Sequence, residues 1–391
     1  MSTEKKRILV FVDWYLPGFR GGGPISSIAN LVEALADRYH FSIVTSDRDH
    51  GQTLPYEGIV QDQWMERSPS CRVWYCSQEG DGYRHIRRII ADTPYDLLYL
   101  NGMFSLRFTI YPLWSSRAAK PQVPVLLAPR GMLHAGALSL KPLKKKLFLM
   151  VIRWIGIHRQ VHFQATYDVE VEDIRRIFGT EATVVSAPNL PRVHLPSFLA
   201  IPKKSGELRL IFLSRLTEHK GLHLILEWLK DQDGQVELDV VGPDEELGYW
   251  DICKGLISEL PDNVTVRKHE AVPPGEATAL LQRAHCLMMP TRGENFGHAI
   301  FEAFCAGRPV LISDQTPWRG LEASKLGFDI ALDDVAGHKG ALESLVRMNQ
   351  EEWNAWARAS WEFAADRLSR SSAVEMYHQM FDALLAKPSE A

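Results

Sequence analysis

Apolar positions in the first half of the chain fall into short runs that alternate with segments of helical period. In one such segment, residues 26–39, Ile28, Leu31, Val32 and Leu35 recur at helical spacing behind a serine that can cap the helix. The apolar runs that we expect to form strands are residues 8–13, 41–46, 72–76, 97–101 and 123–128. Strands that alternate with helices in this way build a parallel sheet.

The second half of the chain repeats this alternation. Its expected strands are residues 208–214, 236–241, 264–268, 286–290 and 309–313, with helix-like segments between them. From residue 340 the pattern is helical to the end of the chain. The sequence therefore predicts a second α/β domain.

The boundary between the two halves lies in proline-rich, aperiodic sequence at residues 187–205. We expect an N-terminal Rossmann-like domain at 1–190, a linker at 191–206, a C-terminal Rossmann-like domain at 207–365, and a last helix within 366–391 that packs back on the first domain. Two doubly wound domains in one chain would face each other across a cleft. Ligands bind such domains at the carboxyl ends of the strands.

The composition narrows the class of protein. With 46% hydrophobic and 24% charged residues and a formal charge of -4, the chain is typical of globular proteins, and nothing indicates nucleic acid as a partner. The first apolar run is shorter than the core of a secretory signal, and no stretch reaches the roughly 20 apolar residues that span a bilayer. We therefore expect a cytoplasmic protein. Its five cysteines form no CxxC pair, so buried free thiols are expected.

The stretch at residues 290–309 lies between two expected strands. Gly307 and Pro309 would end a helix there. Glu294 and Glu302 are separated by two helical turns plus roughly 80°, so a single helix cannot align them. We therefore expect Glu294 in a loop and Glu302 on the second turn of a helix whose N-terminal amides suit phosphate oxygens. Each acid taken alone is also explained as an ordinary surface carboxylate.

A second constellation follows the first strand of the second domain, at residues 213–221. Arg215 can make bidentate contacts to phosphate, and Lys220 can act as a point charge. Solvated surface cations would explain either residue alone. Because this turn and the stretch with Glu294 both follow strands of one domain, their joint occurrence indicates an anion site.

Together these segments resemble the motif set of the retaining GT-B glycosyltransferases of family 4, also called group 1. The resemblance implies a GT-B fold and a nucleotide-sugar donor, which is a substrate, with no cofactor. It implies these donor-binding residues: Gly22, Gly23, Arg215, Lys220, Glu294, Asn295, Phe296, Gly297 and Glu302. In this resemblance Glu294 contacts the donor sugar, Glu302 holds the ribose, and Arg215 and Lys220 stabilise the departing diphosphate.

On the acceptor side, the resemblance implies Asn101, Arg130 and His134. His134 would act in catalysis with Arg215, Lys220 and Glu294, although a structural histidine bonded to backbone is an equal alternative. The family's usual pattern is not kept at Asn295 or at residues 314–321, which leaves the donor sugar open.

We expect catalysis without a metal ion. The leaving diphosphate can itself accept the proton of the acceptor on the same face, so no paired carboxylates of glycosidase type are required. Asp231 and Asp233 lie in a polar turn and are explained as solvated residues.

Residues 141–159 combine two patterns that predict a basic amphipathic helix. The basic residues are Lys141, Lys144, Lys145, Lys146, Arg153 and Arg159, and the apolar stripe is Leu143, Leu147, Met150, Trp154 and Ile157. One interpretation is peripheral contact with the inner face of the cytoplasmic membrane, which would suit a lipid-linked acceptor. The other is a helix packed on the core with a solvated basic face.

The function that the resemblance implies is transfer of a hexose from a UDP- or GDP-sugar to a glycan or lipid-linked oligosaccharide in polysaccharide biosynthesis. Two alternatives stay open: other GT-B chemistry, such as nucleotide-sugar epimerisation, and a non-catalytic nucleotide-sugar-binding scaffold. Arg215, Lys220, Glu294 and Glu302 occur together, which argues against a scaffold.

Overall fold

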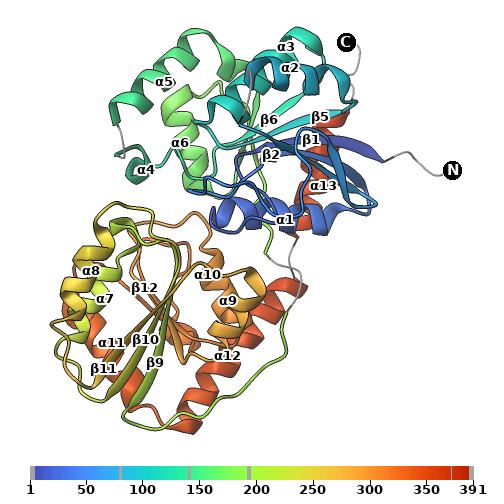
Figure 1. Ribbon diagram of the computed structural model, residues 1–391. Helices are drawn as coiled ribbons and strands as arrows, with labels where there is room; N and C mark the ends of the chain where they lie inside the picture. The colour runs from blue at the N-terminus through green and yellow to red at the C-terminus, as the bar shows by residue number, and fades with distance from the viewer. Residues whose placement is uncertain (1–4, 79–81, 140–141, 192–194, 371, 387–391) are drawn as a thin grey trace. The chain divides into compact units, whose positions relative to one another are not determined.

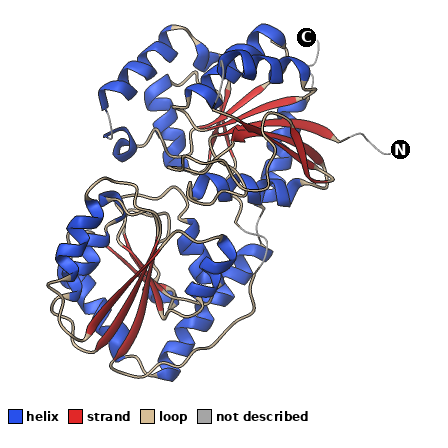
Figure 2. Cartoon of the chain, viewed as in Figure 1, coloured by secondary structure: helices blue, strands red, loops and turns tan. Residues whose placement is uncertain are grey.

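The computed structural model describes residues 5–78, 82–139, 142–191, 195–370 and 372–386 (Figure 1). The chain divides into two compact units, one formed by residues 1–190 and 372–391 and the other by residues 191–371. Each unit is an α/β structure built on its own sheet (Figure 2).

The sheet of the first unit has the strand order β3-β4-β2-β1-β5-β6-β7-β8. Its strands are β1 (Lys6–Val12), β2 (Tyr39–Ser46), β3 (Trp64–Ser68), β4 (Cys71–Cys76), β5 (Leu97–Asn101), β6 (Val125–Ala128), β7 (His162–Ala165) and β8 (Val184–Ser186). β3 runs antiparallel to β4, and the other pairs are parallel. Because helices cover both faces, β1 is apolar and buried from Ile8 to Val12.

Two hydrophobic cores lie on the two faces of this sheet. On one face the core includes α2 (Gly82–Asp92), α3 (Tyr111–Ala119), α5 (Pro142–Trp154) and α6 (Asp168–Phe178). On the other face it includes α1 (Gly23–Leu35) and α13 (Ala373–Leu385), the last described helix of the chain. A short helix, α4 (Ala135–Ser139), precedes α5.

The second unit has a parallel sheet of strand order β11-β10-β9-β12-β13-β14. Its strands are β9 (Glu207–Leu213), β10 (Gln235–Val241), β11 (Val264–His269), β12 (Cys286–Met289), β13 (Val310–Ser313) and β14 (Gly327–Ile330). Its helices are α7 (Leu222–Leu229), α8 (Tyr249–Ile257), α9 (Pro274–Leu281), α10 (His298–Cys305), α11 (Val335–Arg347) and α12 (Gln350–Ser369).

Each strand predicted from the sequence is confirmed, with ends displaced by at most two residues. β3, β7, β8 and β14 were not predicted. The helix that ends the chain begins at Ala373, because α12 continues to Ser369. All five cysteines are free and buried, as expected.

Candidate active site

Glu294 and Lys220 meet at the carboxyl edge of the second sheet. Glu294 lies in the loop between β12 and α10, as predicted, and Lys220 ends a short 3-10 turn between β9 and α7. Lys220 Nζ lies 2.5 Å from Glu294 Oε1, and only 11% and 15% of the two side chains is exposed. The structure thus joins two residues that the sequence nominated 74 positions apart.

A glycine between β9 and α7 makes this contact possible. Gly221 has a φ of +80°, and a Cβ atom there would lie 2.3 Å from the carbonyl oxygen of Pro290. Such a distance excludes a side chain, so the turn after β9 can approach the end of β12 closely. A hydrogen bond also joins the turn after β9 to the loop after β12, because His219 donates its Nε2–H to the carbonyl of Gly293 at 3.2 Å.

Arg215 also has a carboxylate partner. Its Nη1 lies 2.7 Å from both carboxylate oxygens of Glu245, in the loop after β10. Glu245 was not nominated from the sequence, because nothing in a single chain shows which acid lies opposite a given arginine. An anionic ligand that binds Arg215 must compete with this carboxylate.

The remaining donor-side residues lie at the start of α10. Asn295 and Phe296 precede the helix, and Gly297 is its N-cap with a φ of +76°. Glu302 lies on the second turn, as predicted. No side chain caps this helix N-terminus, so backbone amides there can serve a ligand.

In the first unit, Asn101 and Arg130 belong to one hydrogen-bond network. Arg130 donates to Asn101 Oδ1 from Nε at 3.1 Å and from Nη2 at 2.9 Å, to Asn189 from Nη1, and to the Tyr99 hydroxyl at 2.7 Å. Arg130 has a φ of +56°, which few residues other than glycine adopt. All three of its side-chain nitrogens are therefore engaged by the protein, whereas the buried Nδ2 of Asn101 has no partner in the described part of the chain.

Gly22, Gly23 and His134 begin helices of the first unit. Gly22 is the N-cap of α1 with a φ of +65°, and Gly23 is the first residue of that helix. His134 immediately precedes α4, and its Nδ1 accepts a hydrogen bond from the amide of Gly136 at 3.4 Å. That contact supports a local structural role for one ring nitrogen and leaves the other open to a catalytic role.

An open cavity of about 350 Å³ lies at the carboxyl edge of the first sheet. It is lined by Asp13, Trp14, Ser46, Gln78, Arg107 and Phe108, which lie at or after the ends of four neighbouring strands. Asp13 accepts a hydrogen bond from Ser105 Oγ at 2.7 Å, and burial raises the pKa of its carboxyl, an effect that Ser105 partly offsets. Arg107 donates from Nη2 to the carbonyl of Ser77, whereas its buried Nε has no hydrogen-bond partner among the described residues. The sequence did not nominate these residues.

Helix α5 exposes most of the predicted apolar stripe. Leu143 and Trp154 are 83% and 86% exposed, and Leu147 and Met150 are also exposed. The helix packs on the core through Leu149 and Ile152 instead. The prediction that Ile157 continues the stripe was wrong, because α5 ends at Trp154, the chain turns at Gly156, and Ile157 is buried.

The basic residues of this region are exposed at Lys144, Lys146, Arg153 and Arg159, and Lys141 lies outside the described residues. Within the described ranges, no helix has the length and apolar character needed to cross a bilayer.

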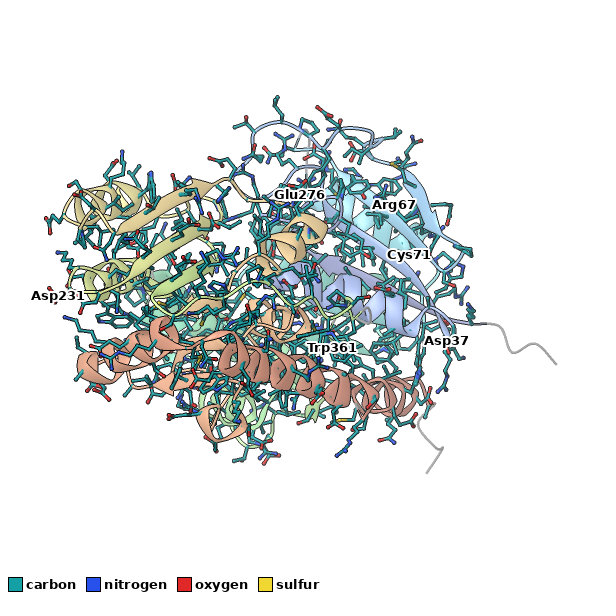
Figure 3. All side chains as sticks on the ribbon, turned by 90° about the horizontal axis from the view of Figure 1, so that it is seen from below. Asp37, Arg67, Cys71, Asp231, Glu276 and Trp361 are labelled. Atoms are coloured by element: carbon teal, nitrogen blue, oxygen red, sulfur yellow. The ribbon has the colours of Figure 1, made fainter. Side chains whose placement is uncertain are left out.

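From the sequence, Asp231 and Asp233 were interpreted as solvated residues. Asp231 pairs with Lys339 at 2.6 Å, its side chain is 74% exposed, and Figure 3 shows it at the outer edge of the second unit. Among the residues that the structure describes, no group of three or more His, Cys, Asp or Glu side chains is placed to hold a metal ion.

Comparison with known proteins finds similarity over nearly the whole chain. Residues 198–352 match the family model for glycosyl transferases group 1, and residues 22–189 match that for a glycosyl transferase 4-like domain. The chain is 25% identical, over 81% of its length and 80% of the relative, to phosphatidyl-myo-inositol mannosyltransferase of Mycobacterium leprae.

Two solved structures are similar in fold. Sucrose-phosphate synthase of Thermosynechococcus elongatus has a TM-score of 0.69 at 18% identity and covers 97% of this chain and 100% of that one. HepE of Anabaena, in complex with UDP and glucose, has a TM-score of 0.66 at 16% identity and covers 97% of this chain and 99% of that one. Together with the two family models and the two α/β units, these matches define a glycosyltransferase of the GT-B fold, and the predicted fold class is confirmed.

The chain belongs to the group 1 glycosyltransferases, also called family 4.

Proposed function

We propose that the protein is a retaining hexosyltransferase that uses a UDP- or GDP-sugar and extends a glycan or lipid-linked oligosaccharide in polysaccharide biosynthesis. The observation that carries the proposal is the position of Arg215, Lys220 and Glu294 at the carboxyl edge of the second sheet, where doubly wound domains bind nucleotides. The similar Mycobacterium leprae protein is named a mannosyltransferase, and HepE was crystallised with UDP and glucose. GDP-mannose and UDP-glucose are therefore the first donors to test.

In the proposed mechanism, Arg215 and Lys220 bind the diphosphate and stabilise its negative charge as its bond to the sugar breaks. Glu294 accepts hydrogen bonds from hydroxyls of the donor sugar, and Glu302 from those of the ribose. The Lys220–Glu294 contact supports this assignment, because the diphosphate and the sugar are adjacent groups in the donor and their binding residues should be neighbours. The departing diphosphate accepts the proton of the acceptor on the same face, so the reaction requires neither a protein nucleophile nor a metal ion.

The test of the donor site is ligand-dependent stabilisation. UDP-, GDP- and ADP-sugars are screened by thermal shift, and the true donor should raise the melting temperature in a concentration-dependent way. Arg215→Gln should weaken this shift strongly. Lys339→Met removes a partly exposed cation, paired with Asp231, from the same unit and serves as the control that retains the shift.

Turnover of the stabilising donor then tests the chemistry. We expect transfer or slow hydrolysis that persists in the presence of a chelator. Loss of activity with EDTA that a divalent ion restores would contradict metal independence. Conversion of the donor to its epimer without an acceptor would contradict the transferase itself.

We propose that the acceptor binds at the cavity beside Asp13, Trp14 and Arg107. A carboxylate, a guanidinium and an aromatic ring are suited to the hydroxyls and the apolar face of a sugar. Asn101 remains an acceptor-side candidate through its unpaired Nδ2, and Arg130 is proposed to hold Asn101 in place. His134 remains a candidate catalytic residue.

Variants of the cavity distinguish the proposed acceptor site from the proposed donor site. Trp14→Ala and Arg107→Gln should lower transfer to methyl glycosides of mannose and glucose while donor hydrolysis persists. Equal loss of hydrolysis in these variants would contradict an acceptor role. His134→Ala should lower turnover with the fold intact, and unchanged turnover would remove His134 from the site.

We propose that α5 rests on the inner face of the cytoplasmic membrane. Leu143, Leu147, Met150 and Trp154 provide apolar surface, and Lys144, Lys146 and Arg153 provide charge that complements anionic lipid. The protein should float with phosphatidylglycerol vesicles at low salt. Lys144→Glu with Lys146→Glu should abolish flotation, whereas Lys339→Glu should not. No flotation of the wild type would end this proposal.

A further inference from the structure

The segment that departs from the family pattern, residues 314–321, is tied to the loop that carries Glu294. The amide of Glu294 donates to the carbonyl of Gln315 at 3.1 Å. Two residues along the loop, the carbonyl of Phe296 accepts a hydrogen bond from the indole Nε1–H of Trp318 at 2.6 Å. These two hydrogen bonds hold both ends of a three-residue stretch, residues 294–296.

Packing on several sides restrains the orientation of the Trp318 side chain. Its side chain is buried, and its ring stacks on Phe301 and contacts Phe304 and Phe363 edge-on. The guanidinium of Arg367 lies over the same ring, 5.1 Å from its centre. Neighbours from α10 and α12 therefore leave the indole N–H little freedom to point elsewhere.

The bond to Phe296 also fixes the peptide that follows it. The Phe296–Gly297 peptide is trans, since Leu16–Pro17 is the cis bond recorded among the described residues. In a trans peptide the C=O and the next N–H point in opposite directions. The carbonyl points at Trp318, so the amide of Gly297 points away from it. That amide makes no hydrogen bond with any residue in the described ranges.

We propose that Trp318 is a positioning residue that sets the direction of the Gly297 amide, so that this N–H meets an oxygen of the donor. The inference rests on the proposed function and deepens it. If the Phe296–Gly297 peptide turned over, a carbonyl oxygen would stand where the donor sugar needs an N–H, and it would repel the sugar oxygen at that position. Gly297, with its φ of +76°, lacks the side chain that would otherwise restrict such a rotation. The restraint therefore comes from the indole.

The first test is Trp318→Phe, which keeps an aromatic ring and removes the hydrogen-bond donor. We expect kcat for hydrolysis of the preferred donor, UDP-glucose or GDP-mannose, to fall by about a hundredfold, the lower end of the loss seen when one preorganised hydrogen-bond donor is removed from an active site. Binding of free UDP or GDP should change much less, because the cations that hold the diphosphate are intact. This separation of kcat from nucleotide affinity is not expected of a general loss of stability.

Trp353→Phe is the matched control. Trp353 is a fully buried tryptophan of the same unit, and its Nε1 also donates to a backbone carbonyl, that of His285, at 3.1 Å. Its loss should lower the melting temperature about as much as that of Trp318 while kcat per folded molecule stays unchanged. Unchanged kcat in Trp318→Phe, or an equal loss in Trp353→Phe, would overturn the proposal.

A second variant separates the hydrogen bond from packing. Benzothienylalanine at position 318 keeps the size of the indole and replaces N–H with sulfur, so it should reproduce the loss of kcat with little effect on stability. Full activity of this variant would assign the effect of Trp318→Phe to packing and refute the proposal. Hydrolysis by the wild type tests the proposed function separately, so its failure is distinguished from failure of the tryptophan's role.

Discussion

The ion pair between Lys220 and Glu294 predicts that stability and activity respond differently to the same set of variants. Both side chains are largely buried and lie 2.5 Å apart. Lys220→Met or Glu294→Gln alone leaves one charge buried without its partner, which should cost about 3 kcal/mol of unfolding free energy. The double variant removes both charges, so most of that loss should be recovered, with a clear coupling energy in the cycle.

Activity should not be recovered in the double variant. Lys220→Met removes a cation that stabilises the departing diphosphate and should lower kcat by about 10²-fold or more. Glu294→Gln removes an acceptor for sugar hydroxyls, and the double variant lacks both functions. It should therefore be at least as slow as the slower single variant.

Urea unfolding measures the free energy of unfolding, and donor hydrolysis measures kcat, on the same preparations of each variant. The control pair Lys339→Met with Asp231→Asn removes a largely solvent-accessible ion pair of the second unit and should change stability and kcat little. Recovery of kcat in the double variant would refute the site assignment, because the two charges would then act only through the fold. Additive losses of stability would instead refute the coupling of the pair.

Three further predictions concern the second unit. Burial lowers the pKa of His338 to about 4, which is below the unfolded value of about 6.5. Stability is therefore lost as pH falls between these two values, and His338→Leu should flatten the pH slope of urea unfolding by up to about 1.4 kcal/mol per pH unit. Equal slopes would contradict this. Arg308 is fully buried and donates to four backbone carbonyls, so Arg308→Met should lower the unfolding free energy by about 3 kcal/mol in thermal or urea denaturation, with UDP or GDP affinity per folded molecule unchanged. Glu245→Gln releases Arg215 from a competing carboxylate, so calorimetry should find tighter UDP or GDP binding, and weaker binding would show that Glu245 helps to place the arginine.

The strands that the sequence predicted are those whose burial imposes a clear pattern. β1 and β12 are covered on both faces and read as continuous apolar runs. β3 lies at the edge of its sheet and is mostly exposed, and β7 has polar His162 and Gln164 within four residues. Such strands exist because their neighbours supply hydrogen bonds, which is information that the local sequence does not carry.

The positions of Lys220, Glu294 and Glu302 in the fold were predictable because helix arithmetic and strand order locate individual side chains. The contacts of these residues were not predictable, because they depend on how closely two backbone segments approach. Lys220 reaches Glu294 because Gly221 has no side chain to block the carbonyl of Pro290. Trp318 stood within a segment already identified as unusual, but only the fold brings its indole to the carbonyl of Phe296. Asp13 is the last residue of a predicted strand and directly follows the observed β1, a signal that could have identified the first-unit cavity.

The return of α13 to the first unit has a consequence for synthesis on the ribosome. Tyr377 and Phe381 belong to a core that also contains residues of β1 and α1, so part of one face of the first sheet stays uncovered until residues 373–385 leave the exit tunnel. Residues 191–371 are translated before that point and contain a complete sheet of their own. The first unit, whose synthesis begins first, is therefore completed after the second, and a nascent chain that stalls before residue 372 presents the uncovered part of that apolar face to chaperones.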